Sequence, residues 1–161
     1  DQVDEHHVMV FYYKIASLYF GTEDYVNAIK YLSKIINNKS LQMREDLLCF
    51  SRILNLVAHY EAGEDYELDR LIKNTYKFLI KMEDLYAVQR EMVAFLRKLG
   101  DIYPHQLKAA FKSLLQKLLT YENHPYERRA FLYLDIISWL ESKIENKSTA
   151  DIIREKFTKL T

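Results

Sequence analysis

The sequence predicts an all-α protein, and three observations carry the prediction. The 161 residues include only 3 Gly and 2 Pro, whereas β-sandwiches and α/β enzymes need many tight turns built from these residues. Apolar residues recur at spacings of three and four, which is the period of one helix face. The three glycines, Gly21, Gly63 and Gly100, lie where such segments stop. They are 42 and 37 residues apart, a spacing typical of helical repeats.

Eight segments show this periodicity, and their short connections predict that neighbouring helices run antiparallel. They are residues 4–20, 25–36, 41–62, 64–79, 84–99, 104–121, 126–144 and 149–160. Gly21 is expected to end the first helix with a positive φ, and Thr22 to cap the second. Ser40 is the expected cap of the third helix, His124 a capping turn residue before the seventh, and Ser148 the start of a capping box.

The seventh segment, residues 126–144, is the most apolar part of the chain. Apolar residues occupy most of its circumference, so we expect burial on two sides. Asp135 interrupts the run. Because Glu127 and Asp135 fall on a rough polar stripe at helical spacing, we place Asp135 near water or a partner cation rather than in a catalytic role.

Composition excludes several classes of protein. The chain has 23 basic and 23 acidic side chains, with a net charge of −3 over residues 1–80 and +3 over 81–161, too small a difference to imply nucleic acid or membrane. The sole cysteine, Cys49, indicates a reducing compartment, so we expect a cytoplasmic protein. The chain begins at Asp1 without Met, so we expect residues 1–161 to be one domain from a longer protein.

The stretch 12–38 resembles a tetratricopeptide (TPR) repeat. The matching positions are Tyr12, Ile15, Ala16 and Tyr19 on one helix, and Tyr25, Ala28 and Leu32 on the next. A weaker copy, 41 residues further on, comprises Ile53, Leu56, Val57, Tyr60, Gly63 and Tyr66. The second copy departs from the pattern at Asp69, which stands where Ala28 stood. Segments 59–61, 95–99 and 131–141 look like the C-terminal part of uncharacterised bacterial TPR-type proteins.

The resemblance implies an α-solenoid of stacked antiparallel helix hairpins that binds a ligand in a concave groove. By register, the groove positions are Tyr13, Ser17, Leu54, Asn55, Ala58 and Glu61. Only Asn55 matches the Lys, Asn and Arg residues with which some TPR domains hold a C-terminal carboxylate, so we reject that mode. Such a groove would suit an apolar or amphipathic helix, including another part of the same parent protein. Alternatively, these residues simply pack against the next helix pair.

No pattern predicts catalysis, a metal or a cofactor. His6 and His7 are adjacent and so point about 100° apart on a helix, and the sequence contains no HExxH or CxxC motif. Cys49 follows Glu45 and Asp46 by one turn, which raises a thiol pKa and disfavours a reactive thiolate. No serine lies in a GxSxG turn, and no glycine-rich loop could cradle a phosphate. We therefore expect a protein that is not an enzyme.

The predicted function is a protein-interaction or scaffold module that binds a partner helix or peptide, or that self-associates as a homo-oligomer. The alternative is nucleic-acid association through basic faces of the fourth to sixth helices. The residues concerned are Lys73, Lys77, Lys81, Arg90, Arg97, Lys98, Lys108 and Lys112. Such rows are usually solvated faces, and nucleic-acid binding requires them to merge into one patch.

Overall fold

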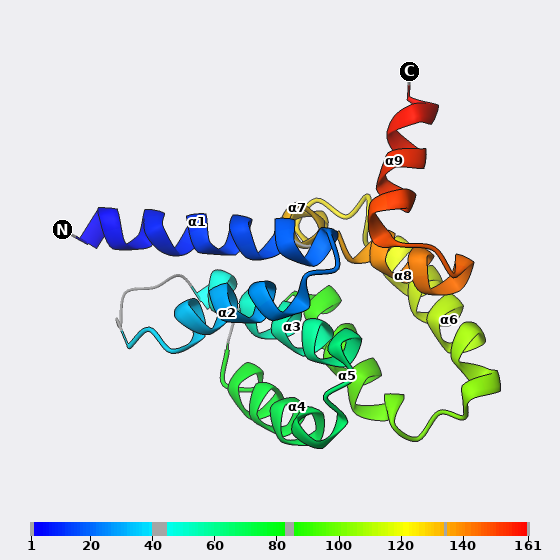
Figure 1. Ribbon diagram of the computed structural model, residues 1–161, viewed down its shortest axis with the longest axis horizontal. Helices are drawn as coiled ribbons and strands as arrows, with labels where there is room; N and C mark the ends of the chain where they lie inside the picture. Colours follow the sequence, from blue (N-terminus) through cyan, green and yellow to red (C-terminus); the bar gives the residue numbers. More distant parts are fainter. Residues whose placement is uncertain (1, 40–44, 83–85, 134, 161) are drawn as a thin grey trace. The chain divides into compact units, whose positions relative to one another are not determined.

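The computed structural model describes residues 2–39, 45–82, 86–133 and 135–160 (Figure 1). Every regular element in these ranges is helical, which confirms the predicted all-α class. Within the same ranges, no helix combines the length and the apolar character that crossing a bilayer requires. The chain divides into two compact units, Asp1–Leu85 and Tyr86–Thr161.

Unit 1 contains the first four predicted helices. They are α1 (Gln2–Gly21), α2 (Tyr25–Ile36), α3 (Glu45–Ala62) and α4 (Asp65–Leu79). Each packs against the next in sequence, and consecutive helices run in opposite directions (Figure 1). The predicted start of the third helix, including its Ser40 cap, lies outside the described residues.

Small residues and tyrosine rings form the contact between α1 and α2. Ala16 and Ala28 are fully buried, as expected for side chains that let two helix backbones approach closely. Tyr31 of α2 packs on two rings of α1, with centroids 5.7 Å from Tyr12 and 5.8 Å from Tyr19. The first helix pair is therefore held by the residue types on which the repeat pattern was based.

The turn between α1 and α2 differs from its predicted form. Gly21 still belongs to α1, and Glu23 adopts the positive φ, at 62°. The Thr22 hydroxyl donates to carbonyls in the last turn of α1. The N-cap of α2 is Asp24, whose carboxylate accepts the Asn27 N–H at 3.2 Å. A carboxylate also stabilises the positive end of the helix dipole, which an uncharged hydroxyl cannot do.

α3 is the most deeply buried helix of unit 1, with α2 and α4 as its packing partners. Its buried apolar side chains are Leu47, Cys49, Phe50, Ile53, Leu54, Leu56, Val57 and Ala58. Gly63 follows the helix with φ 75°, the left-handed conformation that favours glycine. His59 Nδ1 lies 2.7 Å from Glu64 Oε2 and thereby bridges the turn into α4.

Unit 2 is built around α5, α6 and α8. Its elements are α5 (Ala87–Leu99), η1 (Pro104–Gln106), α6 (Leu107–Leu119), η2 (Glu127–Arg129), α7 (Ala130–Tyr133), α8 (Ile136–Glu145) and α9 (Thr149–Lys159). The ring of Phe111 in α6 meets Trp139 of α8 edge-on at 5.7 Å and lies 5.3 Å from Phe95 of α5. These three aromatic side chains join the three helices into one core.

The predicted single helix over residues 126–144 is wrong. The segment forms η2, α7 and α8, and α8 begins at Ile136 directly after Asp135, whose carboxylate accepts the Ser138 N–H at 3.1 Å. Asp135 is therefore an N-cap rather than a member of a polar stripe. The predicted capping role of His124 is confirmed, because its Nδ1 accepts the N–H groups of Tyr126 and Glu127 at 3.2 and 3.1 Å.

Glu127 provides a cap for a helix far away in the sequence. Its Oε2 accepts the Ala87 N–H, in the first turn of α5, at 2.7 Å, and the side chain is almost fully buried. The neighbouring Tyr126 ring stacks on Tyr86 with centroids 4.7 Å apart. Together these contacts fix the start of η2 against the start of α5.

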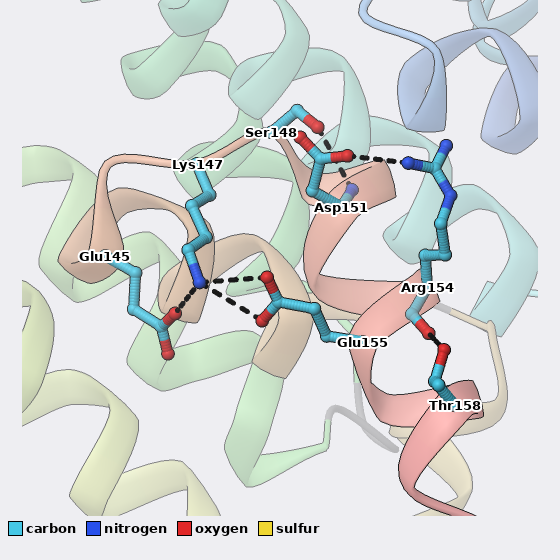
Figure 2. A network of polar contacts seen from close by, with 7 residues as sticks. All are labelled: Glu145, Lys147, Ser148, Asp151, Arg154, Glu155 and Thr158. Carbon is cyan, nitrogen blue, oxygen red and sulfur yellow. Dashed lines mark hydrogen bonds and ion pairs between the residues drawn. The ribbon is translucent and has the colours of Figure 1, made fainter. Parts of the chain in front are cut away.

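Polar contacts attach α9 to the end of α8 (Figure 2). The Ser148 hydroxyl accepts the Asp151 N–H at 3.0 Å, which confirms the predicted N-cap. Lys147 Nζ lies 2.9 Å from Glu155 and 3.1 Å from Glu145. Because all three charged side chains are well exposed, their ion pairs contribute little individually, and they orient α9 more than they stabilise it.

Replacing Glu127 with Ala should destabilise the protein by about 1–3 kcal/mol, because it leaves the half-buried N–H of Ala87 without its charged acceptor. Glu127→Gln retains an acceptor and should lose less. The measurement is urea unfolding followed by circular dichroism. Glu122→Ala, at an exposed position in the same unit, is the matched control and should change stability by less than about 0.5 kcal/mol. Equal unfolding midpoints for Glu127→Ala and the control would disprove the capping role.

Candidate functional site

The predicted groove positions lie on two helices of unit 1. Tyr13 and Ser17 are on α1, and Leu54, Asn55, Ala58 and Glu61 are on α3. Four of the six side chains are buried, and Leu54 and Ala58 are buried completely. The Ser17 hydroxyl donates to the Tyr13 carbonyl at 2.9 Å. Most of these positions therefore contribute to the packed interior of the described chain, and their role in a groove stays a prediction.

Two uncharged side chains on α3 each have a buried oxygen without a hydrogen-bond partner. Within the described residues, Ser51 Oγ and Asn55 Oδ1 have no hydrogen-bond partner. They are four residues apart and so lie on the same side of the helix. Each costs about 1–3 kcal/mol of lost hydration. These two oxygens are therefore polar groups among the buried apolar side chains of α3.

Cys49 is a buried thiol, as the sequence indicates. Burial raises its pKa to about 12, and the negative charges of Glu45 and Asp46 act in the same direction, while Arg52 opposes them. The thiol is therefore protonated at neutral pH and unsuited to nucleophilic attack. The Arg52 guanidinium lies 4.1 Å from the centre of the Phe78 ring, a cation–π contact that joins α3 to α4. Burial lowers the pKa of Arg52.

Tyr25 and Glu61 are linked electrostatically. Burial raises the pKa of the Tyr25 hydroxyl, and the negative charges of Glu61 and Glu23 raise it further. The Tyr25 ring meets Phe20 edge-on at 5.6 Å. The hydroxyl therefore remains protonated at any physiological pH and can serve as a donor but not as a base.

The histidines do not assemble a metal site in the described part of the chain. The rings of His6 and His7 have centroids 6.2 Å apart on α1. Among the described residues, no three His, Cys, Asp or Glu side chains form a group that could hold a metal ion.

α1 carries apolar side chains on two faces. One stripe is buried or nearly so and consists of Met9, Tyr13, Ala16 and Phe20. The second stripe, which we call the outer stripe, consists of Val8, Phe11, Ile15 and Leu18. Its side chains are exposed by 42% for Val8, 61% for Phe11 and 73% for Leu18, and Ile15 is half-buried. The outer stripe has the 3-4-3 spacing of positions a and d in a coiled coil.

Comparisons with protein-family models, curated proteins and solved structures find no match for this chain. The likeness of residues 12–38 to a TPR repeat is therefore a likeness of pattern. The function is inferred from the chain's own surfaces.

The outer stripe of α1 was not among the predicted site residues, although the sequence contains its signal. The outer stripe follows the same helical period as the buried residues of α1. Both sets of residues therefore support the same prediction, a helix, and neither is singled out by it. Sorting the apolar positions into 8-11-15-18 and 9-13-16-20 separates two stripes. A helix that packs on one neighbour needs only one of them.

Cys49 should react with iodoacetamide at least about 100-fold more slowly in the native chain than in urea, because a pKa near 12 suppresses the thiolate. The unfolded thiol loses its proton first, so its contribution to stability should fall as pH rises above about 8.5. Mass spectrometry of timed samples measures the rate. Ser113→Cys in a Cys49→Ser background, at an exposed position of α6, should react quickly in both states. Native Cys49 labelling at the unfolded rate would contradict the assignment.

Proposed function

We propose that this chain is a non-catalytic interaction module that self-associates through the outer stripe of α1. The observation that carries the proposal is the exposure of three large apolar side chains in a row on one preformed helix, Val8, Phe11 and Leu18. A second copy of the chain presents the same stripe. Pairing of the two stripes would bury apolar surface on both copies in a two-fold, self-complementary contact.

The choice of residues favours a parallel pair of α1 helices. Val8 and Ile15 occupy the a positions, and Phe11 and Leu18 occupy the d positions. Branched residues at a with Leu at d favour parallel two-stranded coiled coils. The stripe has no polar residue at these four positions that would favour another register.

The flanking side chains support the same orientation. In a parallel pair, Lys14 of one copy would approach Tyr19 of the other, where an ammonium group can lie over an aromatic ring. In an antiparallel pair of the same register, the two Lys14 side chains would meet across the axis and repel each other. Tyr19 already packs on Tyr31 of the same copy, so its ring is held in place before association.

The expected affinity is modest. Eight partly exposed apolar side chains from two copies would contribute roughly 8–10 kcal/mol at about 1 kcal/mol each. Loss of translational and rotational freedom costs at least about 4 kcal/mol. The remainder of at most about 4–6 kcal/mol corresponds to a dissociation constant of about 40 μM to 1 mM. The proposed contact is therefore reversible and depends on protein concentration.

The solenoid interpretation belongs to the same proposal. Pairing of α1 with α2 and of α3 with α4 as two TPR-like hairpins is supported by the full burial of Ala16 and Ala28, the small residues of the first pattern. In repeat proteins each hairpin contacts its sequence neighbours, and α2 packs against α3 in this way. The outer stripe would then lie on the side of the first hairpin away from the second.

Sedimentation velocity from about 10 to 500 μM should show a monomer–dimer equilibrium for the unaltered chain. Phe11→Glu and Leu18→Glu should each shift it to monomer, because a carboxylate would be buried without a partner. Leu132→Glu is the matched control, at a leucine that is 83% exposed on α7, and it should dimerise normally. A monomer at every concentration, or equal weakening by all three variants, would refute the proposal.

Cysteine crosslinking distinguishes the two orientations. In a Cys49→Ser background, Val8→Cys alone should form a disulfide-linked dimer under mild oxidation if the helices are parallel, because each a position then faces its own copy. An antiparallel pair would crosslink only when Val8→Cys and Leu18→Cys chains are mixed. Non-reducing gel electrophoresis reads the result, and crosslinking solely in the mixture would overturn the parallel assignment.

A further inference from the structure

The charge of the chain is unevenly distributed between its two units. Asp1–Leu85 contains 10 basic and 14 acidic side chains, and Tyr86–Thr161 contains 13 and 9. Within unit 2, residues 86–119 carry 6 basic and 2 acidic side chains, whereas residues 120–161 carry 7 of each. The whole net charge of +4 in unit 2 therefore belongs to α5, η1 and α6, which we call the basic hairpin.

The positive side chains of the basic hairpin face solvent. They are Arg90, Arg97 and Lys98 on α5, and Lys108, Lys112 and Lys117 on α6, all exposed. Lys117 pairs with Glu91 at 2.7 Å and so ties the two helices together. Among the described residues, the side-chain ammonium groups of Lys98, Lys108 and Lys112 make no hydrogen bond or ion pair. The other acidic side chain of the hairpin, Asp101, is exposed near its turn.

Three of the six basic residues, Arg97, Lys98 and Lys108, lie between the middle of the hairpin and its turn. Contact between the rings of Phe95 and Phe111, at 5.3 Å, marks the middle of the two helices. Lys98 follows Phe95, and Lys108 precedes Phe111, so both lie on the side nearer the turn. Lys112 comes directly after Phe111. Helices α5 and α6 are joined at this end by η1 (Figure 1).

An exposed aromatic pair occupies the same turn. Tyr103 is 67% exposed, and its ring is nearly parallel to that of His105, at 16° and a centroid distance of 5.9 Å. Pro104 between them restricts the backbone. A tyrosine that is not needed for the core, in the turn between the helices that carry Lys98 and Lys108, provides a flat surface on which a base could stack.

These observations favour one class of anionic partner. A lipid surface requires large apolar side chains beside the basic ones, and on α5 and α6 the exposed large apolar residue is Leu119, at the end of α6 away from the turn. An acidic peptide would use the charges but not the aromatic platform. We propose that the basic hairpin binds single-stranded nucleic acid, with phosphates at Lys98, Lys108 and Lys112 and a base stacked on Tyr103.

The proposal predicts how strongly the basic hairpin binds single-stranded nucleic acid and how the affinity depends on salt concentration. Three phosphate contacts on a single strand give a slope of about −2 for log K against log salt concentration. Affinity without sequence readout should lie in the micromolar range at low salt. Stacking on one ring contributes about 1–3 kcal/mol, which corresponds to a loss of roughly 5- to 150-fold when the ring is removed. The zero net charge of the full chain limits the long-range attraction.

Fluorescence anisotropy with labelled oligo-dT and oligo-U of about 12 nucleotides, titrated with the full chain at several salt concentrations, tests this proposal. The triple variant Lys98→Glu, Lys108→Glu, Lys112→Glu should weaken binding at least tenfold. Lys73→Glu, Lys77→Glu, Lys81→Glu changes the same number of exposed lysines on α4 and directly after it and should have less effect. Tyr103→Ala should weaken binding at least fivefold, and Tyr103→Phe should not.

Several outcomes would overturn the assignment. They are no binding at low salt, binding without a salt slope, equal weakening by the α4 triple variant, and equal affinity for Tyr103→Ala. Preference for a duplex of the same length would exclude the single-strand class, and equally tight binding of polyglutamate would reduce the surface to a general anion site. Circular dichroism of each variant checks that the helices are intact.

Discussion

The placement of helix starts is the constraint on which the rest of this structure depends. The first four N–H groups of a helix lack internal acceptors, and each one buried without a partner costs stability. Here carboxylates and a hydroxyl supply the acceptors: Asp24 for α2, Asp135 for α8 and Ser148 for α9. Glu127 supplies one for α5 from 40 residues away. These caps fix where each of these helices begins.

Periodicity predicted the helices well because burial of one face is a local property of the sequence. The fold class and the first four helices followed from it. Periodicity failed over residues 126–144 because an apolar run has the same pattern whether it forms one helix or two. Only Asp135 marks the break. The role of Glu127 could not be predicted, because its acceptor function depends on the start of α5, which no local pattern connects to it.

The predicted groove illustrates a different limit. Register assigned Leu54 and Ala58 to a ligand-binding groove, and the structure buries both side chains completely. Spacing shows which side chains share a face of a helix, but whether another helix covers that face depends on the whole chain. The outer stripe of α1 is the converse case. Val8, Phe11 and Leu18 have the composition of a packed face, yet they remain exposed on α1. The buried face of α3 and the outer stripe of α1 differ in solvent exposure, which the sequence pattern does not show and the structure does.

What net charge indicates about a partner depends on the length of chain over which it is counted. Over the full chain it is zero, which argues against a polyanionic partner. Over the basic hairpin it is +4, on two helices held together by Phe95, Phe111 and the Glu91–Lys117 pair. The Debye length at physiological ionic strength is about 8 Å, so a bound phosphate responds to nearby lysines more than to distant carboxylates.

The two proposed surfaces would also reinforce each other. A dimer formed through α1 carries two basic hairpins, and a strand long enough to reach both binds the second at a high effective concentration. Weak pairing of α1 and weak binding of nucleic acid can then combine into tighter assembly on a longer strand.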